Sequence, residues 1–540
     1  MEPHRPQAPS TDGALLVEPP LSSARELLAA NRQRLERWDY DFQGRRASVL
    51  RPLVRTQVLD LAAKFLKDAG LDLPALPPYS TTEPPSLIVT GHQPELFHPG
   101  VWVKSFASAL IARENGAVGF NLIVDNDIPK ASDVKVPREV GGMLKVERVP
   151  FDDWQGEAPY EDLFVHDEAL FTSFADRARK ALGGAVANPI LDEFWPKALG
   201  FRDQTAKPGL RFALARHAVE ASWGVRNVEL PLSAVCESEG FLWFAAHLLT
   251  QLPRFQQIHN EALDRYRRLY HLRSRNHPVP ALGREGDWLE APFWVWRASA
   301  PRRHPLFIRQ LSWTMQLRIG GENDLLAEIP LAPDREGCCA VEQLLALAGG
   351  GVRIRTRALT TTMFARYLLG DLFLHGIGGA KYDELGDAIS GQFFRVEPPS
   401  YMTMSMTLWL GLPADTSASA RLKEVNRQRR DLIYNPDRHL DAPGETEARQ
   451  KAEVKRRAVA SLAETRAEKI ERFHAIRHAN EDLQKFITER RAEVEHARLA
   501  LVDSVRWNGL ALSRDYASVL HSRSRLRGAL ERSLPGLRLE

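Results

Sequence analysis

Two short runs of apolar, β-branched residues constrain the fold of this chain more than any other feature. The first is Ser86 to Thr90 (SLIVT) and the second is Phe120 to Val124 (FNLIV). Such runs are typical of strands buried on both faces of a parallel sheet. The segment between them, Val101 to Glu114, has helical spacing and is followed by Asn115-Gly116, a helix stop signal. A strand, a helix and a strand in so few residues predict a βαβ unit and a parallel sheet.

Around this unit the chain divides into three expected segments. Residues 1–80 hold two amphipathic helices and end in a proline-rich spacer. Residues 81–440 form the α/β core, with mixed helical and strand segments inserted at about 150–350. Within the insertion, 288–309 alternates apolar and polar residues, as antiparallel strands do. Residues 441–540 form the third segment.

The third segment begins with a long run of helical spacing, from about Glu445 to Val502. Its seam positions recur every three or four residues between Val459 and Leu501, with polar breaks such as Asn480. This spacing is typical of a coiled coil, in which a long helix buries its apolar stripe against a partner helix. The alternative is a long helix that packs only on its own domain.

Charge and cysteine content narrow the class of protein. The 72 Lys and Arg residues exceed the 69 Asp and Glu residues by three, so we expect no specific nucleic-acid partner. The cysteines are few and odd in number (Cys236, Cys338 and Cys339), which favours reduced thiols and a cytoplasmic location. The N-terminus has no export signal, and the longest apolar stretch is about half a membrane span. We therefore expect no membrane partner.

The loop from Gly91 to Gly100 joins the first predicted strand to the following helix. Backbone N–H groups and the dipole at a helix N-terminus favour a bound anion. His92 could donate a hydrogen bond or carry a proton, and Lys104 adds positive charge one turn into the helix. The alternative is an ordinary tight connection with surface histidines.

An acidic cluster, Asp125-Asn126-Asp127, follows the second predicted strand. Ligands of open α/β sheets bind at the carboxyl ends of the strands, where this cluster is expected. Its two carboxylates could bind a metal, orient an amine or divide the roles of acid and base. The alternative is turn or helix capping, to which Asp and Asn are well suited. We expect no metal site.

A second glycine-rich segment runs from His375 to Asp383 (HGIGGAKYD). Its glycines allow close approach of the backbone to a ligand, and its polar side chains supply donors, an acceptor and a base. Arg357 is a candidate clamp for a carboxylate or phosphate. The alternative is a turn between helices with Lys381 solvated. We expect this segment and His92 to meet over the carboxyl ends of adjoining strands.

Three segments of the chain resemble the bacillithiol biosynthesis cysteine-adding enzyme family, a family of cysteine ligases. They are Val89–Ala112, Phe120–Val134 and Arg355–Leu385, the last followed by Pro398-Pro399. The resemblance implies a Rossmann-like core with inserted connecting segments and a C-terminal coiled coil that dimerises. It also implies addition of cysteine to an amino-sugar malate conjugate, forming an amide. His92 stands where the family has glutamine.

We therefore expect a ligase-like enzyme that forms an amide (C–N) bond on a small anionic substrate of the amino-sugar class, working as a homodimer. A nucleotide such as ATP or ADP is a candidate cofactor. The alternatives are a nucleotide-binding or nucleotidyl-transferase-like protein, and a coiled-coil scaffold with a vestigial pocket. The expected catalytic residues are His92, Asp125, Asp127, His375 and Tyr382. The expected substrate-binding residues are Gly91, Gln93, Lys104, Asn126, Arg357, Gly376, Gly378, Gly379 and Lys381.

Overall fold

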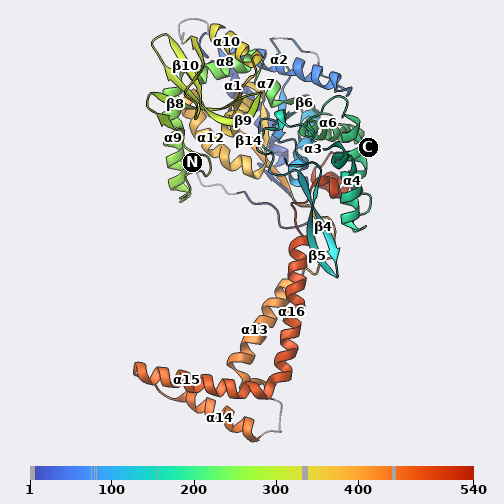
Figure 1. Cartoon of the computed structure of the whole chain (residues 1–540), viewed down its shortest axis with the longest axis vertical. Coiled ribbons are helices and arrows are strands. Elements are labelled where there is room, and N and C mark those ends of the chain that lie inside the picture. Colours follow the sequence, from blue (N-terminus) through green and yellow to red (C-terminus); the bar gives the residue numbers. More distant parts are fainter. Residues whose placement is uncertain are drawn as a thin grey trace. The chain divides into compact units, whose positions relative to one another are not determined.

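The computed structural model describes residues 6–74, 76–77, 79–80, 82–154, 156–330, 338–440 and 446–540 (Figure 1). The chain forms two compact units. Unit 1 comprises Met1–Val136, Glu147–Leu410 and Arg514–Glu540, and unit 2 comprises Pro137–Val146 and Gly411–Ser513. These boundaries differ from the three expected segments, because the last residues, Arg514–Glu540, belong to unit 1, where α17 packs on α3.

The main sheet of unit 1 has six strands in the order β1-β14-β13-β2-β3-β6. All neighbours pair in parallel except β1, which pairs antiparallel with β14 at one edge. The strands are β1 (Leu15–Glu18), β2 (Leu87–His92), β3 (Val118–Ile123), β6 (Val228–Pro231), β13 (Leu372–His375) and β14 (Tyr401–Met406). The two apolar runs form β2 and β3, and the helix between them is α3 (Pro99–Glu114). The predicted strand–helix–strand unit and parallel pairing are confirmed.

Helices cover both faces of the strands at the centre of this sheet, whose residues are mostly apolar and buried. The side chains of Leu87, Ile88 and Val89 are fully buried. Helix α3 packs on β2, β3 and β14, and α12 packs on β13 and β14. The helices of unit 1 are α1 (Ala24–Arg37), α2 (Ala47–Asp68), α3, α4 (Glu168–Leu182), α5 (Leu191–Gly200), α6 (Pro208–Ser222), α7 (Leu232–Val235), α8 (Glu239–Thr250), α9 (Leu252–Leu269), α10 (Cys338–Gly349), α11 (Ala358–Phe364), α12 (Ile377–Phe394) and α17 (Arg523–Ser533).

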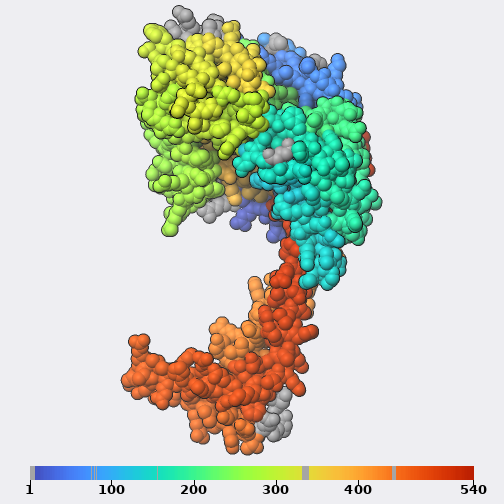
Figure 2. All heavy atoms as spheres, in the orientation of Figure 1, coloured from blue at the N-terminus to red at the C-terminus, as the bar shows by residue number. Residues whose placement is uncertain are grey.

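A second, antiparallel sheet lies in the inserted part of unit 1, in the order β11-β10-β9-β8-β12, with β7 paired to β8. Its strands are β7 (Arg284–Glu285), β8 (Trp288–Arg297), β9 (Ala300–Gln310), β10 (Thr314–Ile319), β11 (Leu325–Pro330) and β12 (Val352–Thr356). The alternating pattern over 288–309 is thus confirmed as antiparallel strands. Figure 2 shows this yellow-green sheet on the same face of unit 1 as the teal-green helices.

Unit 2 is helical apart from the tip of a hairpin formed by β4 (Asp133–Val140) and β5 (Met143–Pro150). Its helices are α13 (Ala418–Tyr434), α14 (Thr446–Ala460), α15 (Arg466–Leu483) and α16 (Thr488–Ala511). A long C-terminal helix, α16, is therefore present. The prediction of one continuous helix from about Glu445 to Val502 is wrong, because the helical run is interrupted twice. Thr465 forms a capping box with Glu468 that starts α15, and residues 484–487 form a 3₁₀ turn before α16.

The expected seam behaves differently at its two ends. Of its later positions, Leu483, Ile487, Val494 and Leu501 are buried within unit 2, where α16 packs against α13 and Val494 joins Leu432 in a small apolar cluster, whereas Arg490 and Ala497 are exposed. Earlier positions are open, since Leu462 is 94% exposed and Phe473 is 61% exposed. Packing on the chain's own helices thus accounts for the later half of the seam only.

Two further expectations concern thiols and membranes. Cys236 is buried and free, whereas the side chains of Cys338 and Cys339 lie outside the described residues. Over the described ranges, no helix combines the length and hydropathy that crossing a bilayer requires.

Candidate functional site

The two glycine-bearing segments meet at the carboxyl edge of the parallel sheet. His92 ends β2, His375 ends β13, and these strands are direct neighbours. Lys104 joins the segments: its Nζ donates to Gly91 O at 3.3 Å, and a Cβ placed on Gly376 would lie 3.9 Å from that nitrogen. The first loop and the start of the second glycine-rich segment, His375-Gly376, therefore lie side by side.

Two of the glycines are required by close packing. A Cβ on Gly91 would lie 2.9 Å from Leu122 O, a backbone atom of the neighbouring strand. A Cβ on Gly379 would lie 2.7 Å from His375 Nδ1. Both positions exclude larger side chains because these distances are far below ordinary carbon contacts.

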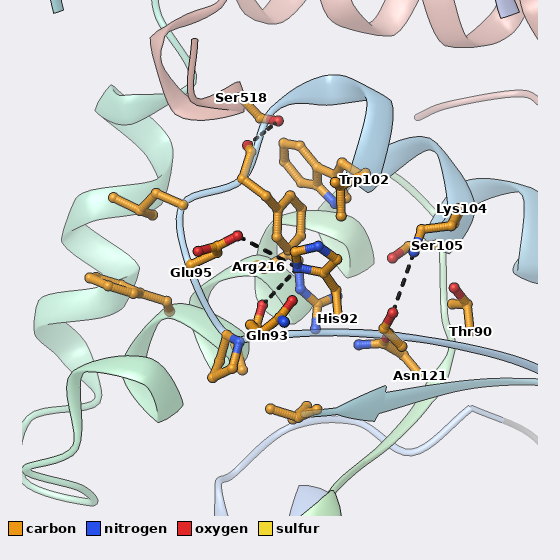
Figure 3. Close-up of a pocket in the computed structure, with 18 of the residues that line it drawn as sticks. Thr90, His92, Gln93, Glu95, Trp102, Lys104, Ser105, Asn121, Arg216 and Ser518 are labelled. Carbon is orange, nitrogen blue, oxygen red and sulfur yellow. Dashed lines mark hydrogen bonds and ion pairs between the residues drawn. The ribbon is translucent and has the colours of Figure 1, made fainter. Parts of the chain in front are cut away.

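A cavity lies between the end of β2, the first turns of α3, helix α6 and the loop at residues 93–97 (Figure 3). Its volume is about 30 Å³, room for roughly two water molecules. The polar residues on its walls include Thr90, His92, Lys104, Asn121, Arg216 and Ser518. The cavity as it stands is too small for a metabolite.

Lys104 supplies the most unusual charge of the site. Its side chain is 4% exposed, and across the described part of the chain no carboxylate lies within ion-pair distance of Nζ. Burial lowers the pKa of Lys104 to about 8, so the amine is still largely protonated at pH 7. A buried ammonium group without a counter-ion is destabilising, and a bound anion would relieve this.

His92 is held beside Lys104 in a neutral state. Its Nδ1 lies 3.3 Å from Gln93 O and 3.8 Å from Glu95 Oε1. Burial, and next the charge of Lys104, lower the pKa of His92 to about 3. The imidazole is therefore neutral at pH 7 and can accept a hydrogen bond, whereas so low a pKa makes it a weak proton acceptor.

The acidic cluster divides into structural and accessible parts. The Asp125 carboxylate accepts hydrogen bonds from Ser233 N at 2.9 Å and Ser233 Oγ at 2.5 Å, and burial raises its pKa. Asp125 thus anchors the start of α7, as the capping alternative proposed. Asn126 Nδ2 donates to Thr356 O at 2.8 Å.

Asp127 instead faces the first loop. Its Oδ2 accepts from Gln93 Nε2 at 2.7 Å, and its Oδ1 accepts from Arg303 Nη1 at 2.9 Å. Gln93, Asp127 and Arg303 therefore form one hydrogen-bonded chain at the edge of the sheet. Arg303 comes from β9 of the antiparallel sheet, and no local motif marks it in the sequence.

The candidate clamp Arg357 is already paired. Its Nη2 donates to Glu290 Oε1 at 2.6 Å, and its guanidinium lies 4.1 Å from the centre of the Trp294 ring. The guanidinium of Arg303 lies 5.1 Å from the same ring. Arg357 is therefore near the Asp127–Arg303 chain, but a ligand would compete with Glu290 for it.

His375 belongs to a buried network. Its Nε2 lies 2.7 Å from Asp383 Oδ2, which also accepts from Arg366 Nη1 at 2.7 Å. Burial lowers the pKa of His375; burial opposes ionisation of Asp383, but His375 and Arg366 outweigh it and lower the pKa of Asp383. This network joins β13 to α12. His375 therefore has a structural role next to the site.

Three expected residues lie on another face of α12. Gly378 and Lys381 are exposed, and the Tyr382 ring contacts the His277 ring at 6.4 Å between centroids. In the described residues no contact links these three to Lys104 or His92. The segment expected as a loop is helical from Ile377, and positions 378, 381 and 382 share one side of the helix.

Comparisons with known proteins do not identify a relative. No family model matches the chain, and no curated protein gives a significant match. Within the ranges that the structure covers, no three His, Cys, Asp or Glu side chains are grouped as a metal site would need.

Proposed function

We propose that the chain is an enzyme that forms an amide bond on a small anionic substrate, at the carboxyl edge of its parallel sheet. The reaction class and a Rossmann-like core are inferred from the resemblance to the cysteine-adding family. The anionic substrate is inferred from the site itself. The single observation that carries it is the buried Lys104 ammonium group without a carboxylate partner.

In this proposal the residues around Lys104 have separate tasks. Lys104 holds the negative group of the substrate next to the N-terminus of α3, where the helix dipole adds to the attraction. His92, neutral at pH 7, accepts a hydrogen bond from the amine of the substrate and orients it. Gln93, Asp127 and Arg303 orient the polar part of the substrate. Asp125 is not assigned as a base, since Ser233 occupies its carboxylate.

The proposal is tested by calorimetric titration of the full chain with malate, a small dicarboxylate. We expect Lys104→Met to weaken malate binding at least tenfold, because a buried charge pair is lost (about 1.4 kcal/mol or more). Lys64→Met, on the exposed surface of α2, is the matched control and should leave the affinity unchanged. Equal affinity in wild type and Lys104→Met would reject the assignment.

Equilibrium dialysis against ATP and ADP, with and without magnesium, examines the nucleotide alternative. Nucleotide binding that persists in Lys104→Met, without malate binding, would favour a nucleotide-binding protein over the ligase-like enzyme.

We also propose that two copies associate through unit 2 as a coiled coil. Support comes from apolar side chains of α14, α15 and the segment between them that are at least half exposed: Val454, Val459, Leu462, Ile470 and Phe473. Exposed apolar side chains on neighbouring helices are the material from which an interface between protein chains is built.

A further inference from the structure

We propose that residues 93–97 form a lid over the cavity at Lys104 and that Ser518 is the latch that keeps it shut. The identity of the ligand beneath the lid rests on the proposed function. The lid itself rests on the geometry of the loop and of the C-terminal segment, which lie more than 400 residues apart in the sequence.

The loop at residues 93–97 is the part of the cavity wall that we propose to move. The other walls are the ends of β2 and β3, helices α3, α5 and α6, and the segment at Ser518-Val519. Ligand pockets are usually about 300 Å³ or larger, whereas this cavity measures about 30 Å³. A cavity of this size does not hold a substrate, and outward movement of the loop would enlarge it beside Lys104.

Few bonds hold the loop against the rest of unit 1. Inside it, Glu95 N donates to Gln93 O and Phe97 N donates to Glu95 O, which shape the loop but do not fix its position. Gln93 bonds Asp127 on one side. On the other side, Phe97 O accepts from both Ser518 N and Ser518 Oγ, each at 2.8 Å (Figure 3).

The segment that carries Ser518 is anchored independently of the loop. Arg514 Nη2 donates to Ser405 Oγ at 2.7 Å and to Met406 O at 3.0 Å, at the end of β14. His521 O accepts from Ile190 N at 2.9 Å, and the His521 side chain is fully buried. Ser518 thus presents two donors from a fixed support to one carbonyl of the loop.

The loop is also bounded by fixed ends. Gly91 is packed against β3, and His98 caps α3 by accepting from Gly100 N at 3.1 Å. Movement is therefore confined to the residues between them. Such a local opening exposes Lys104 without unfolding the sheet.

The latch can be removed with little disturbance to the segment around it. Ser518 is the first residue of the 3₁₀ turn Ser518–Leu520, a position where proline is well tolerated. The preceding residue, Ala517, has φ −56° and ψ 138°, the conformation that proline requires before it. Ser518→Pro therefore deletes both donors, and Ser518→Ala deletes the hydroxyl alone.

The test is pulsed acetylation of the full chain with acetic anhydride at pH 8, without any substrate, followed by mass spectrometry of Lys104. We expect Lys104 to react about threefold to tenfold faster in Ser518→Ala, and faster again in Ser518→Pro, because each lost hydrogen bond raises the open population. Ser522→Ala is the matched control, since its hydroxyl bonds Ser524 Oγ and not the loop. The exposed Lys64 calibrates the reagent.

Two results would overturn the proposal. One is a wild-type rate at Lys104 in Ser518→Pro. The other is an increase at Lys104 matched by faster amide exchange throughout β3, which would mean that the whole core had loosened. Neither result depends on malate, so failure of the lid and failure of the anionic-substrate proposal are distinguishable.

Discussion

The ammonium group of Lys104 lies where its charged form is disfavoured. Its pKa falls from an ordinary 10.5 to about 8 through burial. The folded state therefore binds fewer protons than the unfolded chain between these two values, and stability rises as pH increases through this window. Below pH 8 the full destabilising effect of the buried charge is present.

We predict that Lys104→Met is more stable than wild type at pH 7, by up to about 3 kcal/mol, because the substitution removes the buried charge and keeps an apolar stem. The advantage should shrink as pH approaches 10, where the wild-type amine is neutral. Urea unfolding at both pH values measures the difference. A less stable variant at pH 7 would mean that Lys104 has a counter-ion in the folded protein.

At the residue scale, contiguous motifs were the predictable part of the site. Gly91, His92 and Lys104 follow one strand closely enough that their approach could be expected. Arg303 could not, because it is 176 residues from its partner Asp127 and lies in a different sheet. Asp125 had two plausible roles, and only its contact with Ser233 separates them.

Among the helices and strands, those with a distinctive pattern of apolar residues were the ones that the sequence predicted well. Strands β2 and β3 are apolar on both faces, which few other structures allow, and both were expected within one or two residues. The start of α12 was not, because glycines at 376, 378 and 379 are typical of a loop, whereas the backbone is helical from Ile377. Positions 378, 381 and 382 consequently make no contact with Lys104 among the described residues.

The C-terminal helices illustrate a different limit. Spacing of three and four residues fits a continuous helix as well as a series of helices that pack on one another. The breaks come from local capping at Thr465 and from the turn at 484–487, which the regular spacing conceals. The spacing also does not show which surface each apolar position packs against. Val494 packs within unit 2, whereas Phe473 is exposed.

For the whole molecule, the exposed apolar side chains of unit 2 lead to a prediction about the oligomeric state. We predict that wild type is a dimer in sedimentation equilibrium and that Leu462→Glu with Phe473→Glu lowers the mass to that of one chain, because charges replace buried apolar contacts. Val49→Glu, a 59% exposed position in unit 1, serves as control and should remain dimeric. A monomeric wild type, or a dimeric double variant, would contradict the proposed interface.

The anion site at Lys104 is tested most directly by the protons exchanged when malate binds. Calorimetry at pH 8 in two buffers of different ionisation enthalpy gives this number. Because the amine is about half protonated at that pH and an anion restores its charge, wild type should take up roughly half a proton per malate, and Lys104→Met should take up none. Malate binding to wild type without proton uptake, or equal uptake in the variant, would show that the anion does not bind at Lys104.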